Sequence, residues 1–202
     1  MKSSFPILVY SIMLMCLYSC NIGTVNIETQ EGVNNARDII IERFGENKEI
    51  NGLSLVTATG YVPTMESVLQ TVTIEYPIQN KVYYEVYKLA EPDDVSEPDL
   101  LYKFEPRLLN KSDDTVETVR IKEIKFDEIP SYVEAAKKLI KNKHLYSSIH
   151  LSEWDFSVTK NHQVTHIFTI MCTLKKPEPL QRGSWIRFEI DEEGKLKEKK
   201  YL

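Results

Sequence analysis

The sequence has little of what flexible or repetitive chains are made of, with seven glycines and nine prolines in 202 residues. This composition excludes collagen-like, proline-rich and low-complexity scaffolds. Basic side chains are also in the minority, 25 against 30 acidic ones, and the formal charge of −5 has the wrong sign for a phosphate-binding surface. We therefore expect no nucleic-acid partner. Glycine-rich phosphate loops and the Gly-x-Ser-x-Gly motif are absent as well, so we expect no cofactor and no local catalytic signature.

The residues that are present, 42% apolar and 27% charged, are typical of a globular protein, but the apolar ones are unevenly distributed. Residues 5–17, FPILVYSIMLMCL, carry no charge and follow one basic residue, Lys2. A membrane helix needs about 20 apolar residues, so this run is short for a span. A basic start, a short apolar run and then small residues predict a secretory signal peptide over residues 1–19.

The segment Leu17-Tyr18-Ser19-Cys20 resembles the lipobox of bacterial lipoproteins. Leu17 lies three residues before the cysteine and the small Ser19 directly before it, whereas Tyr18 is larger than is usual. The resemblance implies cleavage before Cys20, a diacylglycerol on its sulfur, and durable attachment through acyl chains such as palmitate. Because Asn21 is not an aspartate, it also implies the outer membrane in a cell with two membranes. The alternatives are an ordinary cysteine after a plain signal peptide, or a short membrane anchor.

The cysteines fit this export route. Cys16 would leave with the signal and Cys20 would be blocked, so Cys172 would be the one free thiol of the mature chain. Cys172 shares one face of an expected strand with Val164, His166, Phe168, Ile170 and Leu174. We therefore predict a buried apolar residue there rather than a reactive thiol.

After the signal peptide, the pattern predicts a polar tether over residues 20–31, a helix-plus-sheet unit over 32–90, an acidic linker over 91–116 and a second unit over 117–202. The first helix is expected at 32–44, ended by Gly45. Its apolar face consists of Val33, Ala36, Ile40 and Phe44. The second helix is expected after Asp127 as N-cap. Its apolar face consists of Ile129, Tyr132, Val133, Ala136 and Ile140.

Alternating or β-branched segments predict the strands. They cover residues 53–61, 69–78, 81–89, 117–126, 153–159, 164–175, 185–190 and 195–201. The fold class is therefore α+β, with two amphipathic helices packed on antiparallel sheet. The order hints at a duplicated α-β-β-β unit. The second unit resembles the helix-on-sheet modules of PepSY-like and cystatin-like proteins, which implies binding or inhibition of proteins, although fold-level analogy is weak support for a function.

Few side chains are candidates for a site. His162 and His166 are four apart, but on a strand this spacing is about 13 Å, so we expect no metal site. The carboxylates of residues 91–99 lack the glycine of an EF-hand loop and predict a solvated loop. Tyr83 and Tyr87 share one side of a strand and Val82, Tyr84 and Val86 the other. If the second set is core, Tyr83 and Tyr87 are exposed aromatic binding residues; alternatively, they cover the sheet.

These observations predict a membrane-anchored, non-enzymatic binding or accessory protein of the cell envelope, with a possible protein partner there. One alternative is a small cone-shaped α+β enzyme with a pocket that brings His166 near a carboxylate, such as Asp155 or Glu189. Another is a structural subunit of an envelope assembly. A deep pocket enclosing His166 and a carboxylate would favour catalysis, whereas a filled core and a flat aromatic face would favour binding.

Overall fold

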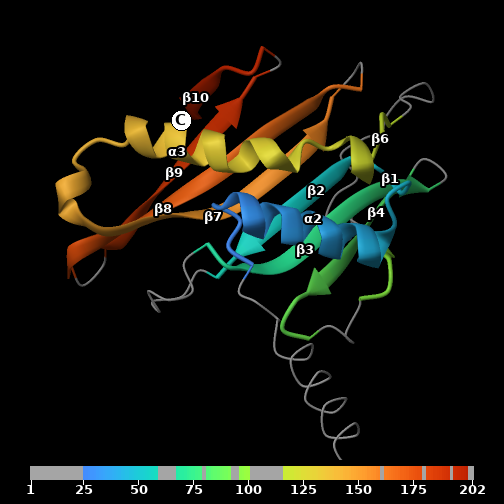
Figure 1. Ribbon diagram of the computed structural model, residues 1–202, viewed down its shortest axis with the longest axis horizontal. Helices are drawn as coiled ribbons and strands as arrows, with labels where there is room; N and C mark the ends of the chain where they lie inside the picture. The colour runs from blue at the N-terminus through green and yellow to red at the C-terminus, as the bar shows by residue number, and fades with distance from the viewer. Residues whose placement is uncertain are drawn as a thin grey trace, which may run out of the picture.

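The computed structural model describes residues 25–58, 67–78, 81–91, 96–100, 116–159, 162–178, 181–191 and 193–199. Two helices, α2 (Gln30–Phe44) and α3 (Ile129–Leu139), lie against one large antiparallel sheet (Figure 1). Its strands are β2 (Gly52–Thr57), β3 (Leu69–Ile78), β4 (Lys81–Lys88), β5 (Asp99–Leu100), β7 (Tyr146–Val158), β8 (Val164–Glu178), β9 (Gln181–Ile190) and β10 (Leu196–Lys199). A second, two-stranded sheet pairs β1 (Glu49–Ile50) with β6 (Val119–Arg120). The chain therefore has the α+β fold that the sequence predicts.

The order of strands in the large sheet, β10-β9-β8-β7-β2-β3-β4-β5, has two mirrored halves. In each half a helix is followed by an antiparallel meander: β2 to β5 after α2, and β7 to β10 after α3. The first strand of each meander meets the other in the middle, where Leu53 pairs with Phe156 and Leu55 with Trp154. Each half therefore repeats a helix followed by strands, with four strands in the large sheet rather than the three of the α-β-β-β unit. The two halves share one continuous sheet and one hydrophobic core.

Helix α2 forms where its apolar spacing predicts it and begins two residues earlier. The Thr29 hydroxyl caps the first turn by accepting a hydrogen bond from the backbone N–H of Gly32 at 3.1 Å. Val33, Ala36 and Ile40 are buried. Gly45, with φ of 88°, ends the helix, because a left-handed backbone conformation favours glycine.

The approach to α3 differs from the prediction. Asp127 is not the N-cap: it lies in the 3-10 turn η3 (Phe126–Glu128), and α3 starts at Ile129 with Pro130 in its first turn. The expected extended stretch 117–126 is strand over Val119–Arg120 alone, followed by the 3-10 turn η2 (Ile121–Glu123). A 3-10 turn places residues three apart on one side, and this buries Ile121 and Ile124 together. The apolar face expected for α3 is confirmed, with Ile129, Val133, Ala136 and Ile140 buried.

The expected tether over residues 20–31 is wrong for residues 25–31, which belong to the fold. Val25 and Ile27 are buried in the core. Between them and the helix, the Glu28 carboxylate accepts hydrogen bonds from the backbone N–H of Leu151 at 2.5 Å and from the Ser67 hydroxyl at 2.7 Å. It also pairs with Lys137 of α3. These contacts fix the chain ahead of α2 to both halves of the sheet.

The expected acidic linker over residues 91–116 also needs correction where the structure describes it. Residues 96–100 run beside β4 instead of forming a solvated loop, and β5 pairs with β4 through Asp99 opposite Tyr84. The backbone N–H of Val86 donates to the Ser96 hydroxyl at 2.9 Å, which holds this edge in place. A charged residue on a short edge strand disfavours pairing with further strands. Residues 92–95 and 101–115 of the predicted linker lie outside the described residues.

The core lies between the helices and one face of the sheet. Trp154 is fully buried and stacks on Phe168 with ring centroids 4.4 Å apart, and Phe168 in turn stacks on Phe188. Cys172 continues this face at 0% exposure, and burial raises the pKa of its thiol to about 11. The prediction that Cys172 is buried is confirmed, and the raised pKa agrees with an apolar residue rather than a reactive thiol.

Candidate functional site

Tyr83 and Tyr87 are not the exposed aromatic residues that one of the two interpretations of this strand predicts. Both are half-buried against the core on the face of β4 that points to α2. Tyr83 lies opposite Tyr76, and the two rings stack with their centroids 6.5 Å apart. Tyr87 lies under the guanidinium of Arg43 in α2, 5.1 Å from the ring centroid. The alternative interpretation, in which these tyrosines cover the sheet, agrees with these contacts.

Glu85 lies between Tyr83 and Tyr87 on this face of β4, and its contacts compensate its charge. Glu85 accepts a hydrogen bond from the hydroxyl of Tyr76 and forms an ion pair with Lys48 at 3.4 Å. The ammonium of Lys48 also lies 3.7 Å from the centroid of the Tyr76 ring. Burial and this hydrogen bond raise the pKa of the Tyr76 hydroxyl, so Tyr76 stays protonated and keeps donating. The group has a structural role.

His162 and His166, the two histidines four residues apart in the sequence, have different environments. His162 is exposed in the connection between β7 and β8, with φ of 55°, and its Nε2 lies 2.8 Å from the Glu117 carboxylate. His166 is 7% exposed within β8. Within the described residues, no group of three or more His, Cys, Asp or Glu side chains is arranged to hold a metal ion.

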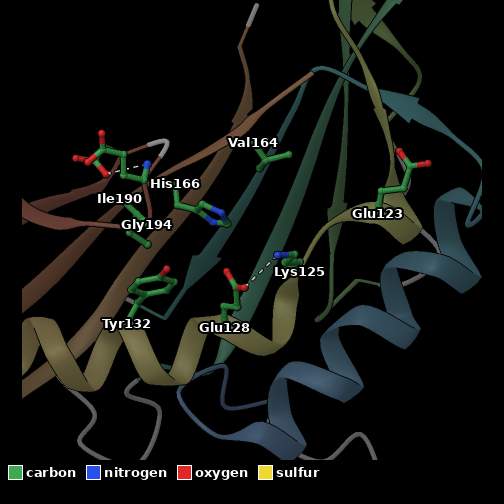
Figure 2. Close-up of a pocket in the computed structure, with 10 residues that line it drawn as sticks. Glu123, Lys125, Glu128, Tyr132, Val164, His166, Ile190 and Gly194 are labelled. Carbon is green, nitrogen blue, oxygen red and sulfur yellow. Dashed lines mark hydrogen bonds and ion pairs between the residues drawn. The ribbon is translucent and has the colours of Figure 1, made fainter. Parts of the chain in front are cut away.

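A cavity of about 400 Å³ opens beside His166, between α3, β8 and the connection from β9 to β10 (Figure 2). Tyr132 of α3, Val164 of β8 and Ile190 of β9 contribute apolar walls. Its acidic lining residues are Glu123, Glu128, Asp191 and Glu193. Lys125 is the basic residue among the described lining and pairs with Glu128 at 3.5 Å. This volume is in the range of small-ligand sites.

The electrostatics of His166 follow from its surroundings. Its ring lies among aromatic rings, with centroids 4.9 Å from Phe156, 5.8 Å from Trp154 and 6.5 Å from Tyr132. Burial, and then the positive charge of Lys125, lower the pKa of His166 to about 4. The imidazole is therefore neutral at pH 7. Its Nδ1 is buried and has no hydrogen-bond partner.

Asp191, Glu193 and Gly194 of the connection from β9 to β10 form one wall of the cavity. The Asp191 carboxylate accepts hydrogen bonds from the backbone N–H groups of Glu193 at 3.2 Å and Lys195 at 2.8 Å, and from Lys197 at 2.5 Å. Gly194, with φ of 75°, completes this turn, and a Cβ there would lie 3.4 Å from the hydroxyl of Tyr132. Glycine thus allows the turn to approach α3 closely.

The cavity brings His166 together with four carboxylates, none of which is Asp155 or Glu189. Asp155 and Glu189, which only the enzyme alternative brings near His166, lie on the opposite face of the sheet, as strand alternation predicts: Glu189 pairs with Ile167 and Ile190 with His166. Among the described lining residues there is no serine, threonine or cysteine to act as a nucleophile. A general base is normally oriented by a hydrogen bond to a second group, and His166 Nδ1 has none.

The sheet face opposite the helices carries a second group of acidic side chains. Glu75 of β3 lies over Gly52, where a Cβ would come within 3.0 Å of its carboxylate. Burial and the charge of Asp155 raise the pKa values of Glu75 and Glu153, while burial chiefly raises that of Asp155. Arg187 of β9 lowers the pKa values of Glu153 and Asp155. Three partly desolvated carboxylates thus lie on this face, two of them, Glu153 and Asp155, within the influence of the Arg187 guanidinium.

No protein-family model, curated protein or solved structure matches this chain. Among the described residues, neither helix has the length and apolar character needed to cross a bilayer. Cys20 and the predicted signal peptide lie outside the described residues. The fold and the two surfaces around His166 and Glu75 define an α+β protein with a small cavity on the helix side and an acidic group on the sheet side.

Proposed function

We propose that this protein is an exported lipoprotein, attached to the outer membrane through Cys20, whose α+β body binds a partner protein of the envelope. The observation that carries the binding role is the one-sidedness of the large sheet. Both described helices lie against the face that holds the core, while no described helix covers the other face (Figure 1). A sheet face of this kind offers a broad surface on which a protein partner can pack.

The composition of the uncovered face supports a protein ligand. Across its centre, Thr73, Ser54, Asp155 and Ile167 lie side by side on four adjacent strands, and all are half-buried. Trp185 of β9 is 58% exposed, and exposed tryptophans are enriched at protein interfaces. Mixed polar and apolar surface with an aromatic anchor is typical of interfaces that form and dissociate.

Charge favours one kind of partner. Glu75, Glu153 and Asp155 are partly desolvated, and the charge of Asp155 raises the pKa values of Glu75 and Glu153. Arg187 offsets the charges of Glu153 and Asp155, and a hydrogen bond with Ser54 also lowers the pKa of Asp155. A lysine or arginine of a partner would relieve this repulsion, whereas an acidic partner would increase it. The proposed partner therefore presents basic side chains to the uncovered face.

Site-specific crosslinking in intact cells tests this proposal. A photo-crosslinking amino acid at Thr73 or Thr169, both on the uncovered face, is expected to capture the same partner protein. The same amino acid at Glu42 of α2 or Lys138 of α3, both exposed on the helix side, is the matched control. Capture from the helix-side positions alone, or from none of the four, would overturn the assignment of this face.

The anchor has its own prediction. Cells grown with radiolabelled palmitate should label the parent protein and the Cys172→Ala variant, and should not label Cys20→Ala, because only a cysteine at the signal-peptide cleavage point is acylated. Labelled protein in the Cys20→Ala lane would disprove lipidation at this residue. Cys172→Ala is the appropriate control, since it removes a cysteine that is fully buried.

A further inference from the structure

The end of the molecule at which α3 finishes carries positive charge. We call residues 138–148 and 173–176 the basic end, because they contain five lysines and no aspartate or glutamate, in a chain with a formal charge of −5. All five lysines are exposed: Lys138, Lys141, Lys143, Lys175 and Lys176. Lys138 pairs with Glu134 of α3 at 2.7 Å. Among the described residues, no acidic side chain pairs with the other four lysines.

The fold brings the two segments of the basic end together. After α3 the chain passes through the 3-10 turn η4 (Lys143–Leu145) and enters β7 at Tyr146. Tyr146 pairs with Leu174 of β8, and η4 contacts the same strand. Lys175 and Lys176 follow Leu174 directly, so the lysines of both segments gather at one end of the sheet, on the left in Figure 1.

The basic end also exposes apolar side chains. Leu139, the last residue of α3, is 51% exposed, and Leu145 of η4 is 47% exposed. Leucine side chains can enter the headgroup region of a bilayer while the stems of neighbouring lysines lie along it and keep their ammonium groups at the lipid phosphates. Positive charge alone would also suit an acidic protein, but exposed leucines among lysines favour a lipid surface.

The chain enters the fold on the side of the sheet where the basic end lies. The backbone carbonyl of Val25 accepts a hydrogen bond from the N–H of Leu69, the first residue of β3, at 2.8 Å. Glu28 pairs with Lys137 in the last turn of α3. The five steps from Cys20 to Val25 span at most about 18 Å, even in a fully extended chain. A lipid on Cys20 would therefore keep this part of the body close to the bilayer.

We propose that the basic end docks on an anionic phospholipid surface, that of the bilayer in which the anchor is held. The lysine ammonium groups contact lipid phosphates, and Leu139 and Leu145 enter the headgroup region. The identity of the bilayer rests on the proposed function, since it requires lipidation of Cys20. The docking surface itself is separate from the uncovered sheet face to which the proposed function assigns the partner protein.

Fluorescence quenching by a nitroxide-labelled phospholipid tests this proposal on the full lipidated chain in vesicles. A fluorescent amino acid replaces His144, which is exposed in η4, or, as a control, Glu193, which is exposed at the opposite end of β9. In vesicles of phosphatidylcholine and phosphatidylglycerol, the label at 144 should be quenched about threefold more strongly than the label at 193. In vesicles of phosphatidylcholine alone, this difference should largely disappear, because the anionic headgroups are missing.

Paired lysine variants test the contribution of charge. Replacing Lys141 and Lys143 by glutamine should lower the ratio of docked to undocked protein about twentyfold, since each lysine near an anionic surface contributes about fivefold. Replacing Lys81 and Lys195 by glutamine is the matched control, because both are exposed and lie at the opposite end of the sheet. This control should leave the ratio unchanged.

Serine variants test the apolar contribution. Leu139→Ser and Leu145→Ser should each reduce the quenching of the label at 144. Ile78→Ser should not, although Ile78 is also exposed, at 43%, because it lies at the connection from β3 to β4.

Equal quenching at the two label positions, equal quenching with and without phosphatidylglycerol, or equal effects of the two lysine pairs would overturn the proposal. If no vesicle quenches the label at 144 and polyglutamate changes its fluorescence instead, the basic end binds an acidic protein. Palmitate labelling separates this failure from that of the anchor. Unlabelled protein refutes lipidation of Cys20 and the bilayer assigned here, whereas labelled protein without quenching refutes docking alone.

Discussion

Replacing Trp154 by alanine is expected to lower the free energy of unfolding by about 3–5 kcal/mol, the cost of a large cavity in a packed core. Trp154 is at 0% exposure on a central strand of the sheet. It stacks on Phe168 and contacts Phe156 and His166, so its loss removes contacts from several rings at once. Thermal unfolding of the full chain should show a melting temperature lower by on the order of 10 °C.

Trp185→Ala is the matched control, because this tryptophan is 58% exposed and its removal leaves no internal cavity. Its effect is expected to stay within about 0.5 kcal/mol. Equal losses for the two variants would contradict the placement of Trp154 at the centre of the core and of Trp185 at its surface.

Local periodicity predicted much of this fold, since the elements whose apolar residues recur regularly lie where they were expected. Strand β3 covers Leu69–Ile78, the predicted range, and its alternate residues Val72, Ile74 and Tyr76 are buried. The same alternation placed Cys172 in the core. In these segments one face is clearly apolar, so local pattern and global burial agree.

The choice between the two interpretations of Tyr83 and Tyr87 could have been made from the sequence. The Val82, Tyr84 and Val86 set is the more apolar one, which made it a candidate for the core face. Strands β3 and β4 pair with Ile78 opposite Lys81, which places Tyr83 opposite Tyr76. Opposite residues in an antiparallel pair share a face, so the short connection and the buried face of β3 together fix which tyrosines turn inward.

Other features depend on contacts between distant parts of the chain. The prediction of a tether over residues 20–31 failed because Glu28, in a polar segment, contacts Ser67, Leu151 and Lys137. These partners are distant in the sequence, so no local pattern predicts the contacts. His166 was recognised as a candidate from its sequence, but Tyr132 and Glu193 reach it only after α3 and the β9–β10 turn come together. Their contribution to the cavity had no local signal.

Lowering the pH is expected to destabilise the protein through His166. Its pKa is about 4 in the folded protein against an ordinary value of 6.5, so between these values the unfolded chain binds the proton that the folded protein excludes. The stability associated with neutral His166 is complete above pH 6.5, declines as the pH falls toward 4, and changes no further below that. The difference between the two pKa values corresponds to about 3 kcal/mol.

The comparison of the parent with His166→Phe measures this effect, because phenylalanine keeps a ring among Trp154 and Phe156 and cannot be protonated. Glu75, Glu153 and Asp155 have raised pKa values and contribute with the opposite sign, since acid relieves their repulsion, but they are the same in both proteins. Denaturant unfolding at pH 8 and pH 4 should therefore show the variant gaining about 3 kcal/mol relative to the parent at the lower pH. His162→Phe, at an exposed turn, should show a much smaller change. A constant difference between parent and His166→Phe across this range would mean that His166 is solvated in the folded protein rather than buried among the rings of Trp154, Phe156 and Tyr132.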